Sequence, residues 1–418
     1  MDPVERLFAL EQFGIKLGLE NIRTLLGALD HPQRAWRSIH IAGTNGKGSV
    51  AAMVERGLRA TGLKTGRYTS PHLSAIEERI ALDGVPIDAE TFAQVTGEVL
   101  GVVDACLQSG ALKVTPTFFE VSTAVAFEIF RRAKIDVAVV EVGLGGRFDA
   151  TNVLTPDITA ITSIAFDHER HLGRTLSAIA FEKAGIAKAG VPLVVGRLPA
   201  EAAKRIAEVA AQVGAPVLDA HATTTDRVYP PLKLALAGRH QLENAAVAVA
   251  ILERWSAVVS AVPTAAIVTG LTQCEWPARL EWLRLPSGAE LLIDAAHNPA
   301  GAAALATYLE DNGLSPLPIV TSIMADKDVT GMVTQLGRVA SSFIATTVPH
   351  QRARSAEALA DTIREIVPRI PVVAEPSPDA AVVTATTGAP RAVAAGSIYL
   401  VGPLRARLLS AGARAVSS

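Results

Sequence analysis

The chain has 418 residues, enough for two or three domains. Its 39 Lys and Arg residues nearly balance its 41 Asp and Glu residues, so the net charge of −2 argues against nucleic acid as the main partner. Hydrophobic residues make up 49% of the chain, yet the longest apolar run, Ala245–Leu252, is far shorter than the roughly 20 residues that span a membrane. With two cysteines and no signal-peptide pattern, the expected compartment is the cytoplasm.

Apolar strand-like runs alternate with helical patterns, which is typical of an α/β fold with mostly parallel sheets. The first unit is predicted to be a strand at 38–42, a tight loop at 43–48 and a helix from residue 49. Residues 135–142 and 158–164 are near-continuous apolar runs, as expected of strands covered on both faces. Polar residues follow all three strands. In a parallel sheet these residues converge beyond the carboxyl ends, where we expect a ligand site.

A second, smaller domain is predicted after this sheet. Pro, Ser and Gly at residues 286–288 interrupt the pattern, so we divide the chain into residues 1–284 and 285–418. The strands predicted in the second domain are 290–293, 318–323, 342–348, 371–374 and 397–401. Alternation of these strands with helices predicts a Rossmann-like α/β domain.

The loop after the first strand has the composition of a phosphate site. Its small residues allow backbone N–H groups to approach phosphate oxygens, the helix N-terminus adds positive charge, and Lys47 can reach the terminal phosphates. It is a variant of G-x-x-x-x-G-K-[ST], because Ile41 replaces the first Gly and Gly48 separates Lys47 from Ser49. The alternative is a Gly-rich turn with a solvated lysine. The predicted phosphate contacts are Thr44, Asn45, Gly46, Lys47, Gly48 and Ser49.

The segment His40–Ser49 resembles the ATP loop of the folylpolyglutamate synthase and dihydrofolate synthase family, a branch of the Mur ligase superfamily. The similarity spans residues 14 to 402 and includes, in order, the motifs at 69–73, 78–80, 117–120, 141–147, 149–152, 162–168, 182–185, 238–241, 294–299 and 326–328. The resemblance implies a Mur-ligase-like P-loop ATPase domain and a C-terminal ligase domain. It also implies ATP-dependent addition of L-glutamate to a folate carboxylate through an acyl phosphate.

A magnesium site is expected at the end of the 135–142 strand. A carboxylate at Glu141 would be costly in a buried strand unless it were paired or bound to a cation, and Mg²⁺ needs only one or two protein ligands beside nucleotide phosphates. The resemblance implies Ser70, Glu141 and His168 as the Mg²⁺ ligands and Lys183 as a carbamylated lysine. Read alone, Ser70 would be a turn residue, His168 an ordinary histidine and Lys183 a solvated lysine. With Lys47, residues Glu141, His168 and Lys183 form the predicted catalytic set.

The resemblance also implies residues that bind the nucleotide and the folate. Asn244, which alone would be an ordinary helix N-cap, is placed at the adenine. Arg279 is predicted to clamp the γ-phosphate, since a guanidinium suits phosphate bidentately, and Asp294 and His297 follow the first strand of the second domain as nucleotide contacts. The implied pterin pocket contains residues 14–17, Thr117, Phe118, Phe119, Phe148, Asp149 and Ala150.

Whether the chain also makes dihydrofolate stays open at this point. Lys16 stands where relatives that make dihydrofolate can carry an Asp, and a cation there offers no acceptor to pterin N–H groups. The expected partners are ATP, Mg²⁺, L-glutamate and a reduced folate or dihydropteroate. The protein is expected to be a monomer.

Two other functions are alternatives. A Mur-type ligase for a peptidoglycan precursor would need an N-terminal UDP-binding domain, and the phosphate loop begins only about 43 residues into the chain. A nucleotide-hydrolysing switch or binding protein would give Asp326-Lys-Asp328 a guanine-reading role, but these residues lie in the other predicted domain from the loop.

Overall fold

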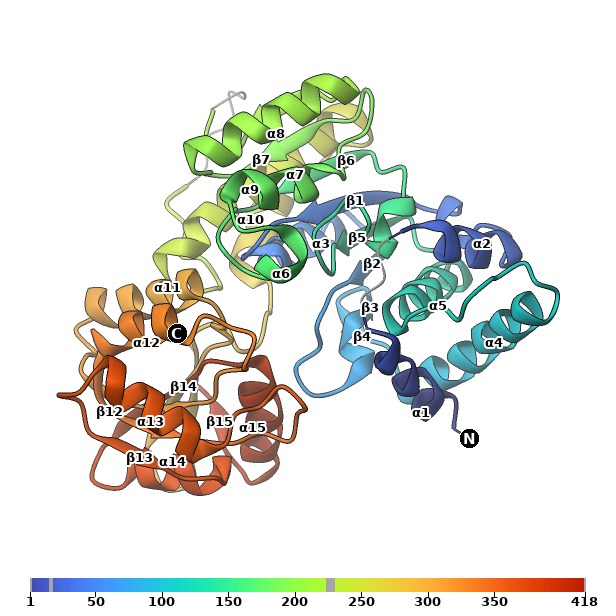
Figure 1. Cartoon of the computed structure of the whole chain (residues 1–418). Helices are drawn as coiled ribbons and strands as arrows, with labels where there is room; N and C mark the ends of the chain where they lie inside the picture. Colours follow the sequence, from blue (N-terminus) through green and yellow to red (C-terminus); the bar gives the residue numbers. More distant parts are fainter. Residues whose placement is uncertain (1, 15–17, 223–229, 417–418) are drawn as a thin grey trace. The chain divides into compact units, whose positions relative to one another are not determined.

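A computed structural model describes residues 2–14, 18–222 and 230–416 (Figure 1). The chain divides into two compact α/β units, which confirms the predicted fold class. Unit 1 consists of Met1–Ile164, Leu172–Lys233 and Glu243–Cys274, and unit 2 consists of Ala165–His171, Leu234–Leu242 and Glu275–Ser418. This division differs from the boundary predicted after residue 284. Residues 275–284 belong to unit 2, together with two short segments from earlier in the chain.

Unit 1 is built on an eight-stranded sheet with the order β4-β3-β2-β5-β1-β6-β7-β8. The strands from β2 to β8 in that order are parallel, and β3 and β4 form an antiparallel edge. The predicted strands at 38–42, 135–142 and 158–164 correspond to β1, β5 and β6, which are neighbours at the centre of the sheet. The bounds are β1 Arg37–Ala42, β2 Thr65–Tyr68, β3 Ile80–Leu82, β4 Val85–Pro86, β5 Val137–Glu141, β6 Ile158–Ile161, β7 Leu193–Val195 and β8 Val217–Asp219.

Helices cover this sheet. The α-helices are α1 Pro3–Phe8, α2 Glu20–Ala28, α3 Lys47–Arg59, α4 Ala89–Gln108, α5 Phe118–Ala133, α7 Leu176–Ala184, α8 Ala200–Val213, α9 Arg239–Val258 and α10 Thr264–Gln273, with 3-10 turns η1 Ala9–Phe13, η2 Pro32–Arg34, η3 Ile76–Arg79 and η4 Ala150–Val153. Helix α9 begins in a unit 2 segment and continues in unit 1. The first helix of the βα unit, α3, starts two residues earlier than predicted, at Lys47.

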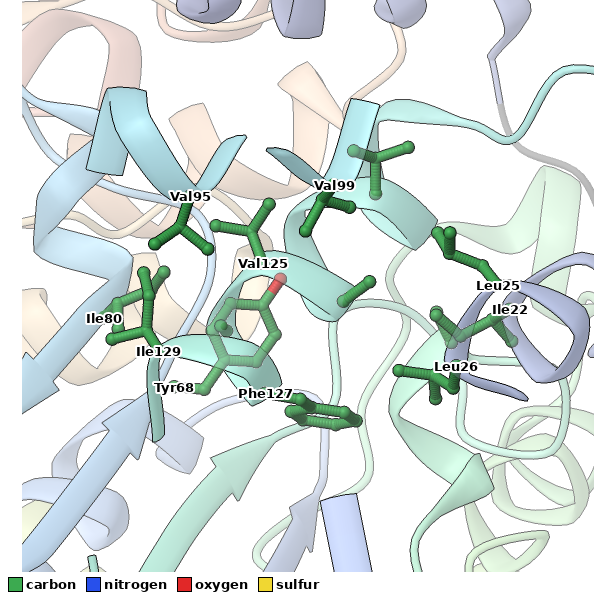
Figure 2. Close-up of a cluster of buried hydrophobic side chains, with 14 of the residues drawn as sticks. Ile22, Leu25, Leu26, Tyr68, Ile80, Val95, Val99, Val125, Phe127 and Ile129 are labelled. Atoms are coloured by element: carbon green, nitrogen blue, oxygen red, sulfur yellow. The ribbon is translucent and has the colours of Figure 1, made fainter. Parts of the chain in front are cut away.

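On one face of this sheet, a hydrophobic core joins β2 to helices α4 and α5. Tyr68 of β2 is fully buried among Val95 and Val99 of α4 and Val125 of α5 (Figure 2). Burial raises the pKa of the Tyr68 phenol, whose hydroxyl is within hydrogen-bond distance of two hydroxyls on α5. Helix α5 is buried over most of its length, because the sheet covers one of its sides and α4 the other. This packing fixes the carboxyl ends of β2 and β5.

Unit 2 has a seven-stranded sheet with the order β13-β12-β11-β14-β10-β9-β15. The first five strands in this order, from β13 to β10, are parallel to one another. Strand β9 pairs antiparallel with β10 and with β15. The strand bounds are β9 Glu281–Arg284, β10 Glu290–Ile293, β11 Leu317–Thr321, β12 Ala340–Ala345, β13 Val372–Ala374, β14 Arg391–Ala395 and β15 Arg414–Ala415. The helix bounds are α11 Pro299–Asp311, α12 Val329–Gly337, α13 Ala356–Ile366, α14 Pro378–Thr386 and α15 Ile398–Ser410. The short helix α6 Glu169–Leu172 ends the unit 2 segment Ala165–His171.

One predicted strand of unit 2 is wrong. Residues 397–401 begin helix α15, and the strand at this point is β14, which ends at Ala395. Both stretches are apolar, so periodicity does not distinguish a short buried strand from the start of a buried helix. The turn between them depends on Gly396, whose φ of +114° favours glycine, and on Ser397, whose Oγ accepts from the Tyr399 N–H at 3.1 Å. Among the described residues, no helix is long and apolar enough to cross a membrane.

Candidate active site

The phosphate loop connects β1 to α3 and is fixed to the segment that follows β6. The Thr44 N–H donates to the Ser163 carbonyl at 2.8 Å, and the Asn45 N–H donates to the Ser163 hydroxyl at 3.0 Å. The Thr162 hydroxyl in turn donates to the Asn45 carbonyl at 2.6 Å. These bonds hold the loop open in front of the first turn of α3, whose backbone N–H groups have no partner within the helix. The loop is therefore preorganised to bind an anion.

Two glycines are required by this loop geometry. Gly43 has φ +147°, and a Cβ there would lie 2.0 Å from the Thr162 hydroxyl oxygen. Gly46 has φ +86°, and a Cβ there would lie 2.2 Å from Oδ1 of Asn244. Asn244 lies inside α9 and not at its N-cap, so the ordinary interpretation of this residue is wrong. Its buried amide contacts the phosphate loop within unit 1, beside the predicted nucleotide position.

Three of the predicted catalytic side chains gather at the carboxyl edge of the unit 1 sheet. Lys47 Nζ donates to the carbonyls of Gly43 at 3.1 Å and Thr44 at 3.2 Å, and it lies 3.7 Å from Glu141 Oε1. Lys183 Nζ donates to the same Gly43 carbonyl at 2.8 Å. Glu141 is the last residue of β5 and is 5% exposed. Two ammonium groups thus meet at the first carbonyl of the loop, and one of them lies beside a buried carboxylate.

The environment of Lys183 differs from that of a solvated lysine. Its side chain is 5% exposed, because α7 packs Lys183 against the sheet rather than toward solvent. The neighbouring Glu182 faces outward and forms a salt bridge of 2.7 Å with Arg147. Burial of one lysine in an otherwise ordinary helix is costly without a specific partner, so its position supports a role at the loop.

The residues of unit 1 fit a magnesium ion. Ser70 lies two residues past the end of β2, and β2 is hydrogen-bonded to β5, whose last residue is Glu141. Within the described ranges no three His, Cys, Asp or Glu side chains form a protein-only metal cage. A single buried carboxylate beside a phosphate loop suits Mg²⁺, which keeps most of its coordination for water and phosphate.

The predicted pterin residues Thr117, Phe118 and Phe119 start helix α5. Thr117 is its N-cap, and its hydroxyl and N–H are bonded to the carboxylate of Glu120, so T-F-F-E is also a capping box. Phe118 is buried and stacks on Phe8 with ring centroids 5.7 Å apart. Phe119 stacks on Tyr68, at 6.1 Å. Both rings therefore have packing partners within unit 1, and Phe119 is the more accessible of the two.

The second predicted pterin segment follows β5. Asp149 caps η4 and accepts from the N–H groups of Thr151 at 3.0 Å and Leu144 at 2.8 Å. Burial is the main cause that raises the pKa of Asp149, although these hydrogen bonds oppose it. Phe148 lies under the guanidinium of Arg147, 4.3 Å from the ring centroid. Asp149 thereby fixes the loop that carries Phe148 and Ala150. Residues 15–17, including Lys16, lie outside the described residues.

In unit 2, Arg279 lies in a strained loop. Its neighbours Ala278 and Leu280 have φ values of +55° and +51°, which are uncommon for residues other than glycine. Asp294, at the end of β10, accepts the Leu280 N–H at 2.9 Å through one oxygen and the Ala296 N–H at 2.9 Å through the other. Strain of this kind persists where the surroundings enforce it, often at functional sites. Asp294 thus holds the backbone directly after Arg279 and directly before His297, and the Ala278 N–H before Arg279 donates to Glu281 at 2.8 Å.

His168 belongs to a unit 2 segment organised by Asp167. Lys327 forms a salt bridge of 2.5 Å with Asp167, Asn298 donates to it at 3.1 Å, and His297 Nε2 lies 3.5 Å away. Burial alone would raise the pKa of Asp167, but the His297 hydrogen bond and the charges of His168 and Lys327 lower it well below the usual range. His168 itself has φ +51°, and its N–H donates to Asp167.

The sequence does not reveal the residues that hold the phosphate loop of unit 1 or the Asp167 segment of unit 2 in place. The sequence places Asp167 among the polar residues after the third strand that are expected near the ligand, but it does not indicate the individual contacts that Thr162, Ser163 and Asp167 make. Lys327 pairs with Asp167 and Asp328 caps α12, with its carboxylate accepting the Gly331 N–H at 2.8 Å. These contacts leave the D-K-D motif a structural role and give no support to guanine recognition.

The fold and the loop geometry are those of an α/β nucleotide-binding protein with a variant P-loop, and comparisons with known proteins identify its family as Mur-type ligases. Residues 278–401 match the family model "Mur ligase, glutamate ligase domain". The chain is 40% identical over 376 residues to a dihydrofolate synthase/folylpolyglutamate synthase of Mycobacterium tuberculosis, covering 82% of this chain and 76% of that protein.

Solved structures extend the likeness over nearly the whole chain. The M. tuberculosis folylpolyglutamate synthase complexed with ADP and AMPPCP superposes with a TM-score of 0.88 at 34% identity, covering 97% of this chain and 99% of the other. A bifunctional folylpolyglutamate synthase/dihydrofolate synthase with Mn, AMPPNP and L-glutamate bound gives a TM-score of 0.85 at 29% identity, covering 98% of each chain. The chain belongs to the folylpolyglutamate synthase/dihydrofolate synthase family.

Proposed function

We propose that this chain is an ATP-dependent ligase that adds L-glutamate to the carboxylate of a reduced folate. The observation that carries the proposal is the meeting of Lys47 and Lys183 on the Gly43 carbonyl, with Glu141 at 3.7 Å from Lys47. This cluster lies beyond the carboxyl end of β1, which is where open parallel sheets bind their ligands. Family membership supports the same activity.

The reaction follows from the chemistry of carboxylate activation. An oxygen of the folate carboxylate attacks the γ-phosphorus of ATP, the bond to the ADP oxygen breaks, and an acyl phosphate forms. The amino group of L-glutamate then attacks the carbonyl carbon, loses a proton and expels inorganic phosphate as the amide forms. The protein forms no covalent bond with the substrate, so positioning and charge stabilisation account for catalysis. Lys47 stabilises the charge on the transferred phosphoryl oxygens.

The metal is proposed to be Mg²⁺. Ser70, Glu141 and His168 would hold it, and the bound ion would neutralise charge on the β- and γ-phosphates. A relative solved with Mn supports a divalent cation in the family. Glu141 is suited to this part because its carboxylate is buried at the carboxyl end of β5, 3.7 Å from the loop lysine Lys47.

We infer the nucleotide contacts of each unit from the family resemblance. In unit 1 the backbone N–H groups of the loop from Thr44 to Ser49 bind phosphates, and Asn244 contacts the adenine. In unit 2 Arg279 binds the γ-phosphate, His297 contributes a polar contact, and Asp294 holds the strained backbone that presents Arg279. The relatives solved with ADP and ATP analogues support a nucleotide site of this kind.

Lys183 is proposed to carry a carbamate. Its buried amine has the Gly43 carbonyl as a hydrogen-bond acceptor, and a carboxylate added to it would orient groups around the metal. Protein equilibrated with ¹³C-labelled CO₂ should show a carbamate signal in a ¹³C spectrum that disappears in Lys183→Ala. Absence of that signal, together with full activity of Lys183→Ala, would contradict the proposal.

The folate is proposed to bind along Thr117, Phe118, Phe119, Phe148, Asp149 and Ala150. Release of ADP should require L-glutamate and should occur with tetrahydrofolate. Comparable release with dihydropteroate would show that the chain also synthesises dihydrofolate. Release of ADP at the same rate without L-glutamate would favour a nucleotide-hydrolysing switch instead. The cytoplasmic location and the monomeric state expected from the sequence stay predictions.

A further inference from the structure

A second polar cavity lies in unit 1, at the edge of the sheet opposite the phosphate loop. Its volume is about 430 Å³, and its lining includes Arg23 of α2, Arg34 of η2 and Lys188. Arg34 precedes β1, and Lys188 precedes β7, so the cavity is at the amino ends of these parallel strands. The phosphate loop follows the carboxyl end of β1, roughly 17 Å away along the six-residue strand.

The charge of this cavity is unbalanced. Arg23, Arg34 and Lys188 line it, and none of its lining residues is acidic. In the described part of the chain, none of these three cations forms a salt bridge. The exposed Arg37 at the same edge does have a carboxylate partner, Asp157 at 2.7 Å. Burial, and then the nearby charge of Arg23, lower the pKa of Lys188. Such a group of cations has a field that attracts multivalent anions.

The wall that holds Lys188 is fixed before any ligand arrives. Lys188 Nζ donates to Asn152 Oδ1 at 2.7 Å, and the Asn152 amide donates to the carbonyls of Arg147 and Gly185, each at 3.0 Å. Asn152 is 7% exposed. One ammonium in the lining is therefore held in place, and the exposed side chains of the two arginines line the cavity from α2 and η2. Preorganisation of this kind reduces the entropy lost on binding.

We propose that this cavity binds a small multivalent anion that carries phosphate or several carboxylates. Guanidinium groups bind both chemistries bidentately, and the ammonium of Lys188 supplies a third charge. The volume accommodates a molecule of the size of pyrophosphate or citrate. The site is separate from the phosphate loop and does not depend on the proposed ligase activity.

Titration calorimetry at low salt, without magnesium, tests the proposal with pyrophosphate and with citrate as probes. The background protein carries Lys47→Ala, so that binding at the phosphate loop is weakened. Arg23→Gln and Arg34→Gln remove one charge each from exposed positions, and neither side chain makes a hydrogen bond among the described contacts. The matched control is Arg37→Gln, which removes the same charge at the same edge of the sheet but outside the cavity.

We expect one equivalent of at least one probe to bind, with affinity reduced roughly tenfold by either cavity substitution and less than twofold by Arg37→Gln. Binding of pyrophosphate alone would identify a phosphate compound as the ligand class, and binding of citrate alone would identify an oligocarboxylate. Two results would overturn the proposal: no saturable binding of either probe at millimolar concentration, or an equal loss of affinity in the Arg37→Gln control.

Discussion

Replacement of Lys47 by alanine should slow ligation roughly a hundredfold or more while leaving the fold intact. Lys47 Nζ makes two hydrogen bonds to loop carbonyls, at 3.1 and 3.2 Å, and a weaker ion pair with Glu141 at 3.7 Å. Hydrogen bonds of this kind contribute about 1 kcal/mol each, so the free energy of unfolding should fall by about 1–2 kcal/mol. The loss of a charge-assisted contact in the transition state should cost about 3 kcal/mol, or roughly a hundredfold in kcat/KM.

The assay is glutamate-dependent ADP release, with circular dichroism and thermal unfolding to show that the variant is folded. Lys64→Ala is the matched control, because Lys64 is exposed between α3 and β2 and its backbone N–H, not its side chain, makes the bond to Asp136. This control should keep nearly full activity. Turnover of Lys47→Ala within a fewfold of the parent protein, or an equal loss in Lys64→Ala, would refute the role of the phosphate loop.

Three further predictions test other parts of the account. Glu141→Gln should raise the Mg²⁺ concentration for half-maximal rate at least tenfold and the KM for L-glutamate much less; an unchanged Mg²⁺ dependence would remove Glu141 from the metal site. Gly46→Ala should weaken ADP binding roughly tenfold in calorimetry, because the new Cβ would lie 2.2 Å from Asn244. The control Gly62→Ala, which has φ +90° but open space around it, should bind ADP normally. Equal binding by both variants would contradict this prediction. Burial, and then the charge of Lys188, lower the pKa of His40 to about 3, so the folded state stays neutral there while the unfolded chain gains a proton below about pH 6.5. The parent should therefore lose about 2 kcal/mol of stability between pH 7 and pH 5 that His40→Gln does not lose, and identical slopes in denaturant titrations would count against it.

The parts of the fold predicted from sequence are those with local signals. The β-branched run that became β5 and the glycine-rich loop after β1 each carry their own signature, so the P-loop unit and Glu141 at a strand end were predictable. The strand β14 and the start of α15 were not separable, because an apolar stretch buried on all sides has no periodicity that favours either structure.

The features that escaped prediction depend on contacts between distant residues. Lys183 has the sequence context of an exposed helical lysine, and only the packing of α7 buries it against Gly43, 140 residues earlier. The pairing of Asp167 with Lys327 spans 160 residues and has no local signature. The sequence predicts Asn244 at a helix start, but α9 begins five residues earlier, at Arg239. In each case tertiary packing decides the role of a residue type that is ordinary in its local sequence.

The most direct test of the central claim follows oxygen from the folate to phosphate. Tetrahydrofolate labelled with ¹⁸O in the carboxylate that accepts glutamate is incubated with ATP, Mg²⁺ and L-glutamate, and both products are analysed by mass spectrometry. An acyl-phosphate ligase transfers one ¹⁸O atom to inorganic phosphate for each glutamate added. Unlabelled phosphate, or phosphate formed without any glutamylated folate, would contradict the account.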